Sequence, residues 1–534
     1  MSITDQTCAK LRVTSAASEI LTAAQMRAAE RMATGGAVRD LYPLMARAGG
    51  ALADRIAALS PPCSILFACG PGNNGGDGYV AARILRQLGW PVRVAALAEP
   101  ALQTEAARAR ASYEGTIDDL HGLELSAFDI VVDGLFGIGL NRAITGRALE
   151  AIRAIAAWRA GPQTSGGAPR RIIAIDIPSG LIADDNNRDN RAGSILSADH
   201  CVTFFRKKFA HVLLPGNAHC GAVFVEDIGI ADSVLTGMEP QPAREIARSY
   251  VESVWPWPAW DTHKYRRGAA MVVCGGPSQT GAARLAARSA LRVGAGLVTL
   301  LAPDASIPIL AAHETSVMMA RLGAPDELAA LTRRARSVLI GPALGLDDLA
   351  KGHVLALCAV AKVRPDLSLI LDADALTLLA QELPARIHET LNIREAASRV
   401  VLTPHEGEFN RLFPDLTLAP DAKHELRRSA ITEAARRSGV VIILKGPNSL
   451  VAHPDGRLFV NETGSPFLAT AGSGDVLAGL VTGLMAQGLL ALEAAKLACW
   501  LHGFLGERSG PGLIAEDLVA AIKPALAALA PPAA

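Results

Sequence analysis

The chain has 534 residues, of which 50% are hydrophobic and only 19% are charged, and its 52 basic and 52 acidic side chains cancel. A chain of this length predicts more than one globular domain, and a net charge of zero argues against a surface built to bind nucleic acid. Aromatic residues make up 4% of the chain, which is too few for a base-stacking platform.

The eight cysteines are scattered, without a C-x-x-C pair or the Cys/His spacing of a zinc site, which indicates a reducing compartment. The first residues contain an early acid and no apolar run, so they do not resemble a signal peptide. The most apolar stretch, 476–506, is interrupted by polar and charged residues and predicts buried helices instead of a membrane span. We expect a cytoplasmic protein with small-molecule substrates and neither nucleic-acid nor membrane partners, and we expect it to form a homo-oligomer.

In the first half, a short apolar run at 64–69 predicts a buried parallel strand. It leads into the glycine-rich loop 70–78, Gly-Pro-Gly-Asn-Asn-Gly-Gly-Asp-Gly, and then into an expected helix at 79–88. Strand, glycine loop and helix form the geometry of a dinucleotide or phosphate site, although the spacing fits neither G-x-G-x-x-G nor a P-loop. The alternative is a tight turn made of residues that tolerate a left-handed backbone.

Two further expected strands, at 129–133 and 171–176, end in Asp133 and Asp176. Ligands of open parallel sheets lie beyond the carboxyl ends of the strands. One aspartate at a strand end is often only a helix cap. Two such aspartates, together with the asparagines of the 70–78 loop, predict a binding site at one edge of a sheet.

Three segments carry a resemblance: the Asn-Asn-Gly-Gly-Asp loop, Val-Asp-Gly-Leu-Phe-Gly-Ile-Gly-Leu at 132–140, and Asp-Ile-Pro-Ser-Gly at 176–180. Over about residues 20–230 the chain resembles the YjeF N-terminal family of NAD(P)H-hydrate epimerases, whose domain is Rossmann-like. The resemblance implies that Asp176 is the acid/base of the reaction. It implies a potassium ion held by Asn74, Asp133 and Ser179. The substrate contacts that it implies are Asn73, Asn74, Gly75, Gly76, Asp77, Gly137, Ile138, Gly139, Leu140, Asn141, Arg142, Ala143 and Asp176.

One segment departs from the family's pattern. Where the family usually has Lys-Pro-Gly, this chain has Lys-Lys-Phe-Ala-His at 207–211. The resemblance therefore assigns no role to Lys208.

A stretch rich in proline and tryptophan, 236–260, divides the chain. Proline at this density argues against regular structure, so we expect an irregular linker. It would separate an epimerase domain, 1–235, from a second domain, 261–534.

The second half repeats one pattern: a short apolar strand, a polar residue or glycine at its end, and then a helix. We expect strands at 269–274, 298–302, 337–340, 367–371, 400–402 and 440–444. This alternation predicts a doubly wound α/β domain, so that the chain would consist of two such domains. Asp372, His405 and Lys445 follow three of these strands. Lys445 could meet a nucleotide phosphate, whereas a histidine at such a position is often structural.

The turn Gly472-Ser473-Gly474-Asp475 opens an apolar run, 476–484, that predicts a helix. Backbone N–H groups at a helix start can gather around an anion, and the helix dipole adds to the attraction. Asp475 would stand where it can take a proton from a hydroxyl that attacks phosphorus. The alternative is a glycine-rich helix entry with Asp475 as a capping acid.

Over about residues 262–528 the chain resembles the ribokinase-like superfamily and, within it, the ADP/ATP-dependent NAD(P)H-hydrate dehydratases. The matching segments are Gly-Ala-Gly-Leu-Val-Thr at 294–299, Asp-Ala-Asp-Ala-Leu at 372–376, Pro-His-Glu-Gly-Glu-Phe at 404–409, Leu-Lys-Gly at 444–446 and Gly-Ser-Gly-Asp-Val-Leu-Ala-Gly at 472–479. The resemblance implies that Asp475 is catalytic beside an anion hole of Gly472, Ser473 and Gly474. The implied contacts of the hydrated cofactor are Ala282, Gly345, His405 and Asp475. The implied contacts of ADP or ATP, bound with Mg²⁺, are Lys445, Gly446, Pro447, Asn448, Ser449 and Gly474. Ala343 and Ala471 replace family glycines, and each adds a methyl group near a ligand.

Together the two resemblances predict a bifunctional enzyme that repairs hydrated NADH and NADPH. The first domain would interconvert the R and S epimers that form when water adds at C6 of the nicotinamide ring. The second would phosphorylate the hydroxyl of the S epimer at the expense of ADP or ATP and then release phosphate. The alternative is a ribokinase-like kinase of a vitamin or sugar, fused to a non-catalytic YjeF-type binding module.

Overall fold

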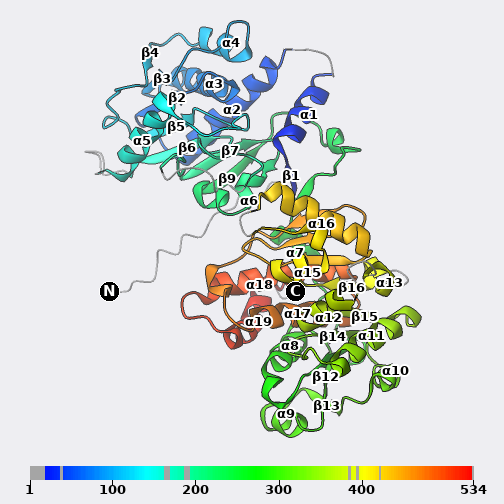
Figure 1. Cartoon of the computed structure of the whole chain (residues 1–534). Coiled ribbons are helices and arrows are strands. Elements are labelled where there is room, and N and C mark those ends of the chain that lie inside the picture. Colours follow the sequence, from blue (N-terminus) through cyan, green and yellow to red (C-terminus); the bar gives the residue numbers. More distant parts are fainter. Residues whose placement is uncertain are drawn as a thin grey trace, which may run out of the picture. The chain divides into compact units, whose positions relative to one another are not determined.

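The computed structural model divides the chain into two compact units, Met1–Pro242 and Ala243–Ala534 (Figure 1). The structure describes residues 18–35, 40–161, 169–185, 193–382, 387–391, 396–419 and 422–531. The N-terminal stretch on which the expectation of no signal peptide rests lies outside these ranges. Within them, no helix combines the length and the apolar character that crossing a membrane requires.

The first unit is built on a parallel sheet whose neighbouring strands all run in the same direction. Its strands, in spatial order, are β4 (Ile117–Asp119), β3 (Val92–Ala96), β2 (Ile65–Cys69), β5 (Ile130–Gly134), β6 (Arg171–Ile175), β7 (His200–Phe204) and β9 (Ala222–Glu226). The strands expected at 64–69, 129–133 and 171–176 are confirmed as β2, β5 and β6. In addition, β1 (Glu19–Leu21) pairs in parallel with β8 (Lys207–Lys208).

Helices cover both faces of this sheet, because strands that are apolar on two sides must be buried on two sides. Phe67 of β2 packs in the cluster that contains α2 and α3, whereas its neighbour Leu66 packs in the cluster that contains α5. The helices of the unit are α1 (Ala23–Ala33), α2 (Tyr42–Leu59), α3 (Asn73–Gln87), α4 (Glu105–Ala111), α5 (Gly146–Ala160), α6 (Phe209–Val212) and the 3₁₀ turns Gly216–His219 and Asp232–Leu235.

The helix after β2 begins earlier than the sequence predicts. We expected it at 79, but α3 starts at Asn73, so the asparagines and glycines of the predicted loop form its first turns. A Cβ atom on Gly75 would lie 2.0 Å from the carbonyl oxygen of Gly70, so the helix can start this close to the strand only with glycine at that position.

The second unit is built on a longer sheet that is parallel from β13 to β17. The order of its strands is β13 (Met318–Arg321), β12 (Leu297–Ala302), β11 (Ala269–Val273), β14 (Ser337–Ile340), β15 (Ser368–Leu371), β16 (Val400–Leu402), β17 (Val441–Leu444), β18 (Leu450–Ala452), β19 (Leu458–Val460) and β10 (Ala243–Glu245). β18 is antiparallel to both β17 and β19, and β10 is parallel to β19. The six strands expected in this half are confirmed, each within about two residues.

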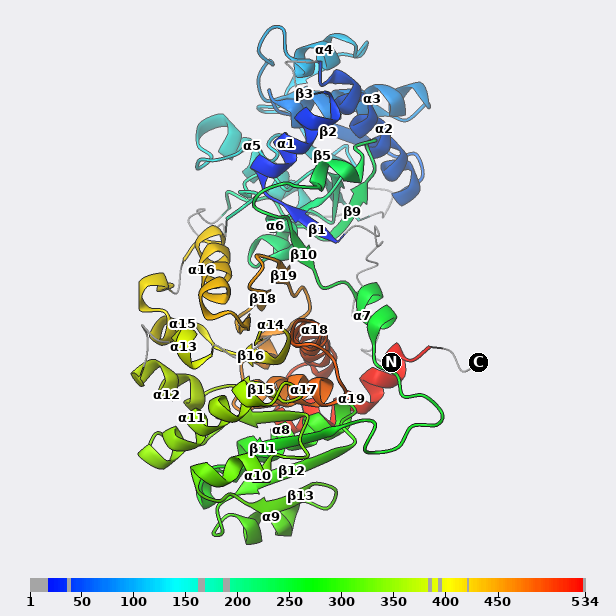
Figure 2. The same cartoon turned by 90° about the vertical axis from the view of Figure 1, so that its right-hand side faces the viewer.

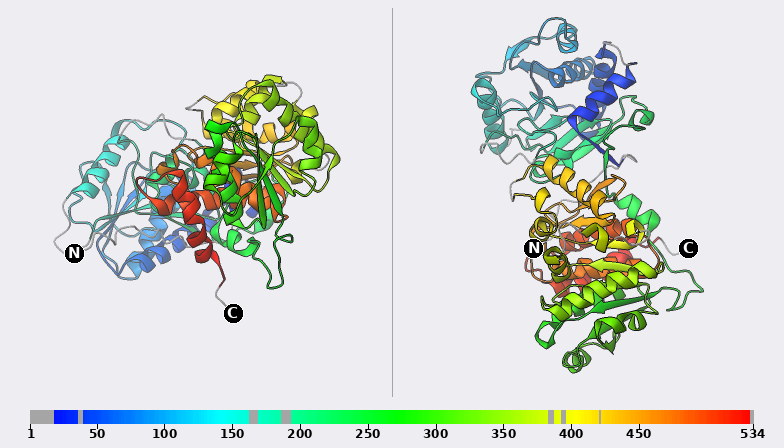
Figure 3. Two further views of the ribbon diagram at one scale, coloured as in Figure 1. Left: turned by 90° about the horizontal axis from the view of Figure 1, so that it is seen from below. Right: turned by 45° about the vertical axis from the view of Figure 1, so that its right-hand side comes forward.

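The helices of the second unit lie against this sheet and can be followed in Figure 3. They are α7 (Arg248–Val254), α8 (Thr280–Val293), α9 (Ile307–His313), α10 (Leu328–Leu331), α11 (Asp348–Val363), α12 (Asp374–Glu382), α13 (Ile387–Thr390), α14 (Ala396–Arg399), α15 (Glu406–Leu412), α16 (His424–Ser438), α17 (Ser473–Ala486), α18 (Ala491–Ser509) and α19 (Ala515–Leu529), with 3₁₀ turns at Pro277–Gln279, Pro325–Glu327, Pro414–Leu416 and Pro466–Leu468.

α17 is the buried helix of this unit; it packs beside α8, and both helices lie against the sheet (Figure 2). All its residues from Val476 to Ala486 are buried, as expected for a helix that is apolar on every side. A Cβ atom on Gly479 would lie 2.3 Å from the carbonyl oxygen of Ala286 on α8. The glycine therefore allows close packing of the two helices.

The expectation of an irregular linker at 236–260 is wrong. This stretch contains β10, which pairs with β19, and α7, and Trp255 is buried in the core of the second unit. The prolines precede β10 or follow α7, where a missing backbone N–H removes no hydrogen bond of either element. Proline density therefore marked the ends of short elements and not an unstructured segment.

Candidate active sites

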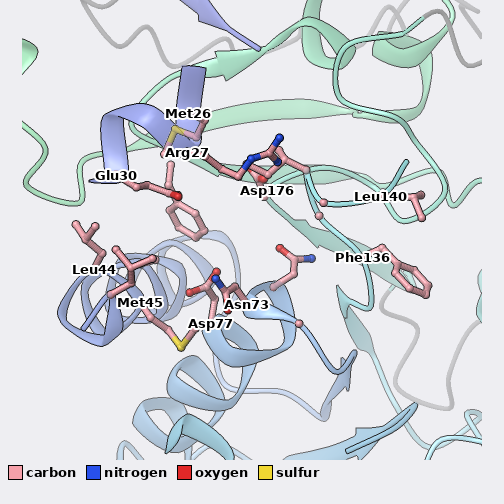
Figure 4. Close-up of a pocket in the computed structure, with 18 of the residues that line it drawn as sticks. Met26, Arg27, Glu30, Leu44, Met45, Asn73, Asp77, Phe136, Leu140 and Asp176 are labelled. Carbon is pink, nitrogen blue, oxygen red and sulfur yellow. The ribbon is translucent and has the colours of Figure 1, made fainter. Parts of the chain in front are cut away.

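A cavity of about 750 Å³ opens in the first unit, beyond the carboxyl ends of β2, β5 and β6 (Figure 4). Its walls come from α1, α2, the start of α3, the loop after β5 and the residue that follows β6. This volume is typical of a small-molecule site, and its position at the strand ends is the one that the sequence predicts.

Most residues expected to bind the epimerase substrate line this cavity. They are Asn73, Asn74, Asp77, Gly137, Ile138, Gly139, Leu140, Asn141, Arg142 and Asp176. Gly75, Gly76 and Ala143 are not part of its wall. Gly75 and Gly76 have packing roles instead, because a Cβ atom on Gly76 would lie 2.5 Å from Cε of Met45.

Asp176 follows β6, and its φ of +62° lies in the left-handed region that non-glycine residues rarely adopt. Its Oδ1 accepts hydrogen bonds from Lys208 Nζ at 2.8 Å and from Thr203 Oγ1 at 2.7 Å. Burial opposes the charged form, but the Lys208 ammonium group and these hydrogen bonds outweigh burial, and the pKa of Asp176 lies below its ordinary value. The carboxylate is therefore ionised at neutral pH.

Lys208 and His211, to which the sequence assigned no role, hold Asp176 in place. Lys208 is 1% exposed, and its Nζ also donates to Thr203 Oγ1 at 2.9 Å and to the Phe204 carbonyl oxygen at 3.2 Å. His211 joins the two backbones: its Nδ1 accepts from the Lys208 N–H at 2.9 Å, and its Nε2 lies 2.8 Å from the Asp176 carbonyl oxygen. Burial and the Lys208 charge lower the pKa of His211 to about 4, so the neutral ring donates from Nε2. The available signal was weak: a histidine three residues after the last of three consecutive basic residues, 206–208.

Two further acids, Asp77 on α3 and Glu30 on α1, line the same cavity. Burial raises the pKa of Asp77 well above its ordinary value, and the negative charges of Asp176 and Glu30 raise it further. Burial also raises the pKa of Glu30. The surroundings therefore favour the ionised form of Asp176 and the protonated form of Asp77.

Asp133, at the end of β5, is fully buried. Its Oδ1 accepts from Ser179 Oγ at 2.6 Å and from the Leu135 N–H at 3.2 Å, and its Oδ2 accepts from the Ser179 N–H at 2.7 Å. Burial raises the pKa of Asp133 to about 6, although the hydrogen bonds from Ser179 act in the opposite direction. Among the described residues, no cationic side chain lowers this pKa. Asn74 packs nearby, since a Cβ atom on Gly134, the residue after Asp133, would lie 3.3 Å from its carbonyl oxygen, and one on Gly137 would lie 2.9 Å from its Oδ1. Oxygen atoms around a buried, uncompensated carboxylate form a donor set that suits a hard cation.

Cys201, His211 and Cys220 form another group of ligand-type atoms, all within 4.8 Å of one another. Both ring nitrogens of His211 are already engaged, and burial raises the pKa of Cys201 well above its ordinary value. A metal ligand must be a free nitrogen or a thiolate, so this group is part of the core.

In the second unit, the Gly-Ser-Gly-Asp turn forms the start of α17. Gly472 precedes the helix with a φ of +85°, which favours glycine. Ser473 is buried, and its Oγ lies 2.9 Å from Nε2 of His502, whose pKa burial lowers to about 4. The Ser473 N–H makes a long hydrogen bond of 3.4 Å to the Thr470 carbonyl oxygen. The N–H groups of Gly474 and Asp475 come before the first intrahelical bond, which the Val476 N–H makes to the Gly472 carbonyl oxygen, and are available to an anion.

Asp475, in this first turn, interacts with charged groups at two strand ends. Lys445 Nζ donates to Asp372 Oδ1 at 2.7 Å and lies 3.7 Å from Glu408 Oε2. Thr403 Oγ1 donates to the same oxygen of Asp372 at 2.6 Å. Burial and the charge of Asp372 raise the pKa of Asp475 to about 7, although Lys445 lowers it. An acid with a pKa near neutrality is suited to accept and return a proton.

His405 begins α15 and acts as its cap, because its Nδ1 accepts from the N–H groups of Gly407 at 2.9 Å and Glu408 at 3.3 Å. The structural interpretation of this histidine is therefore correct for Nδ1. Its side chain is nevertheless 54% exposed, and its backbone pairs with Lys445. Its Nε2 lies 3.3 Å from Glu408 Oε1, the acid that also approaches Lys445.

The other expected dehydratase residues lie on loops and first turns of the second unit. Ala282 is in the first turn of α8, and the Gly345 N–H donates to Asp374 Oδ2 at 2.9 Å. A Cβ atom on Gly474 would lie 3.6 Å from Lys445 Nζ. The expected nucleotide contacts between β17 and β18 are Gly446 and Pro447, both exposed, Asn448, which is buried, and Ser449, which is half-buried.

The two alanines that replace family glycines differ in their surroundings. Ala343 has a φ of +49°, a backbone conformation that glycine adopts without strain. Ala471 is exposed and lies directly before Gly472. A methyl group at 343 therefore carries a conformational cost that one at 471 does not.

Comparisons with known proteins agree with both halves of this description. Residues 41–210 match the family model of the YjeF-related protein N-terminus, and residues 270–521 match that of NAD(P)H-hydrate dehydratase. The bifunctional NAD(P)H-hydrate repair enzyme of Thermofilum pendens is 33% identical over 522 residues, which cover 91% of this chain and 92% of the relative. That of Escherichia coli is 33% identical over 514 residues, which cover 93% and 92%. The solved structure of an ADP/ATP-dependent NAD(P)H-hydrate dehydratase from Bacillus subtilis is 25% identical, with a TM-score of 0.45, and covers 54% of this chain and 98% of its own.

Proposed function

The chain belongs to the family of bifunctional NAD(P)H-hydrate repair enzymes, and we propose how its two units divide that work. The first unit interconverts the R and S epimers of hydrated NADH and NADPH. The second dehydrates the S epimer. The observation that carries this division is that each unit holds its own aspartate within reach of a lysine's charge at the carboxyl end of a parallel sheet: the buried Asp176 pairs with Lys208, and the charge of Lys445 acts on the half-buried Asp475.

In the first unit, the substrate ring occupies the cavity in front of Asp176. The carboxylate, kept ionised by Lys208, accepts a proton from an oxygen at C6. His211 keeps both residues in position through their backbones. The donors and acceptors of Asn73, Asn141 and Arg142 orient the rest of the hydrated cofactor.

We also propose that Asn74, Asp133 and Ser179 hold a potassium ion. Their oxygen atoms fit such an ion, and the raised pKa of Asp133 is that of a buried carboxylate without a compensating charge. A bound cation would supply that charge and would keep the loops after β5 and β6 in place.

In the second unit, Asp475 accepts the proton of the C6 hydroxyl as that oxygen attacks the terminal phosphorus of ADP or ATP. Lys445 and the first-turn N–H groups of α17 stabilise the negative charge on the transferring group. The phosphate ester is a better leaving group than hydroxide, so loss of phosphate restores the dihydropyridine. Mg²⁺ accompanies the nucleotide and screens its phosphates. This function would be performed in the cytoplasm by a homo-oligomer.

A kinase of a vitamin or sugar, fused to a non-catalytic module, is not favoured. A binding module has no need of a buried lysine–aspartate pair, and the first unit retains Lys208 and Asp176 in its cavity.

The decisive experiment supplies a mixture of R and S hydrates of NADH or NADPH with ADP or ATP and follows the return of dihydronicotinamide absorbance. Asp475→Asn should abolish this return and leave epimerisation intact. Asp176→Asn should allow rapid consumption of the S epimer only. If absorbance did not return with either nucleotide, the repair function would be refuted, and if one substitution removed both activities, the division between the units would be wrong.

A further inference from the structure

Inversion at C6 is a reaction on two faces of one carbon atom. The hydroxyl group leaves from one face, and a hydroxyl group must be restored on the other. Departure needs a proton donor and addition needs a proton acceptor, and a single fixed side chain reaches one face of a planar intermediate. An epimerase of this kind therefore gains from two acid/base groups on opposite walls of its cavity.

The cavity of the first unit has this arrangement. Figure 4 shows Asp176 on one side, above the strands, and Asp77 on the other, where it projects from the start of α3. Asp176 is held by Lys208 and Thr203, whereas Asp77 lies near Glu30 of α1, a second acid on the cavity wall. The two carboxyl groups therefore belong to different elements and have opposite electrostatic surroundings.

We propose that Asp77 is the catalytic acid/base for the face of C6 opposite Asp176. This proposal rests on the epimerase function of the first unit and adds a reacting group to it. Asp77 is expected from the sequence only as a substrate contact.

In one direction, Asp77 gives its proton to the C6 hydroxyl group. The C6–O bond breaks, its electron pair leaves with the oxygen as water, and the N1 lone pair forms an iminium bond to C6. A second water adds to C6 from the other face, Asp176 accepts its proton, and the iminium electron pair returns to N1. One water leaves and one enters, and solvent returns a proton to Asp77 and takes one from Asp176. The reverse reaction uses the same groups with exchanged roles.

The protonation states of the free site fit the first step. Burial and the charges of Asp176 and Glu30 raise the pKa of Asp77, which favours the form that can donate a proton. Lys208 lowers the pKa of Asp176 against the effect of burial, so that residue starts as the acceptor. Two titratable groups whose pKa values are driven apart in one cavity are typical of an acid and a base with separate roles.

The test is oxygen exchange in H₂¹⁸O, with each purified epimer of hydrated NADH incubated separately without nucleotide. Chiral chromatography measures inversion, and mass spectrometry measures label in the epimer that has not inverted. Asp77→Asn and Asp176→Asn should each reduce inversion by about 10²–10⁴-fold. Each variant should still incorporate ¹⁸O into one of the two epimers without inverting it, through the aspartate that remains. The two variants should incorporate ¹⁸O into different epimers. Asp54→Asn, an exposed change of the same type on α2, should match the unmodified chain.

Inversion by Asp77→Asn within tenfold of the unmodified chain would overturn the proposal. So would label in the same epimer with both variants, or label in neither epimer with Asp77→Asn, because the residue would not then serve one face. Asp77→Glu, which keeps the acid, should recover part of the inversion and separates chemistry from folding. If the unmodified chain neither inverted nor labelled its substrate, the epimerase function itself would fail, which is a different result from all of these.

Discussion

Removing the lysine of the epimerase site should destabilise the first unit strongly and in a pH-dependent way. In Lys208→Met the buried Asp176 loses its only ion-pair partner among the described residues, and the apolar side chain fills much of the space of the lysine stem. Breaking a buried pair by removing one partner costs about 3–5 kcal/mol, because an uncompensated charge stays buried. The expected loss at neutral pH is of that size.

The sign of the pH dependence follows from the two pKa values of Asp176. In the unmodified chain its pKa is depressed by folding, so its stabilising contribution is present above the pKa of the unfolded state and is lost as pH falls through the folded pKa. In Lys208→Met burial dominates and the folded pKa lies above the unfolded one. The variant then gains stability as pH falls through that raised pKa, so its deficit is largest at neutral pH and shrinks in acid.

Native-state hydrogen exchange is the appropriate assay, because two units in one chain need not unfold together. Amides of β6 report opening of the first unit, and amides of β15 report the second, which should not change. Lys207→Met removes the same charge from the neighbouring, half-buried position and should cost less than about 1 kcal/mol. A loss below about 1 kcal/mol in Lys208→Met, or a deficit that grows in acid, would refute the reasoning.

Four further predictions concern single contacts. Asp372→Asn should lower the pKa of Asp475 from about 7, because it removes a negative charge, and so move the acidic limb of dehydration kcat/KM to lower pH in an absorbance assay. Lys445→Met should weaken ADP or ATP binding at least about tenfold in calorimetry, since a charge-assisted contact to phosphate is lost. Gly75→Ala should abolish epimerisation in a chiral assay and destabilise the first unit by about 1–3 kcal/mol or more, because its Cβ would lie 2.0 Å from a carbonyl oxygen, while dehydration continues. Replacing K⁺ by choline should reduce the exchange protection of β5, and in Asp133→Asn the two salts should give equal protection.

The positions of the site residues along the strands could be predicted because a buried parallel strand is a short apolar run with an abrupt polar end. That pattern placed Asp133, Asp176 and Lys445 at the carboxyl edges of their sheets, where the structure has them. It also predicted α17 as a buried helix, since its apolar residues occupy every face and not one stripe.

The contacts that set the chemistry could not be predicted in the same way. Lys208 reaches Asp176 across 32 positions of the chain, and His502 reaches Ser473 across 29. Neither pairing leaves a local pattern, because a polar residue in an apolar segment has the same spacing whether it binds a catalytic group or only caps a helix. The early start of α3 was missed because glycines lower helix propensity, whereas the tight return of the chain past Gly70 requires glycine at position 75.

The two sites show that a lysine beside an aspartate does not by itself determine the protonation state. Lys208 lowers the pKa of Asp176, and no neighbouring carboxylate raises that pKa enough to cancel the effect of the lysine. Lys445 also acts on Asp475, but it is bound to Asp372, and the remaining charge of that carboxylate, together with burial, brings the pKa of Asp475 to about 7. The difference fits the chemistry. An aspartate that takes a proton from an alcohol and later returns one must change state near neutral pH, whereas an epimerase can divide donor and acceptor between two walls of one cavity. The lysine alone therefore does not decide the protonation state: burial and the charge of Asp372 outweigh it at Asp475, whereas Lys208 and the hydrogen bonds outweigh burial at Asp176.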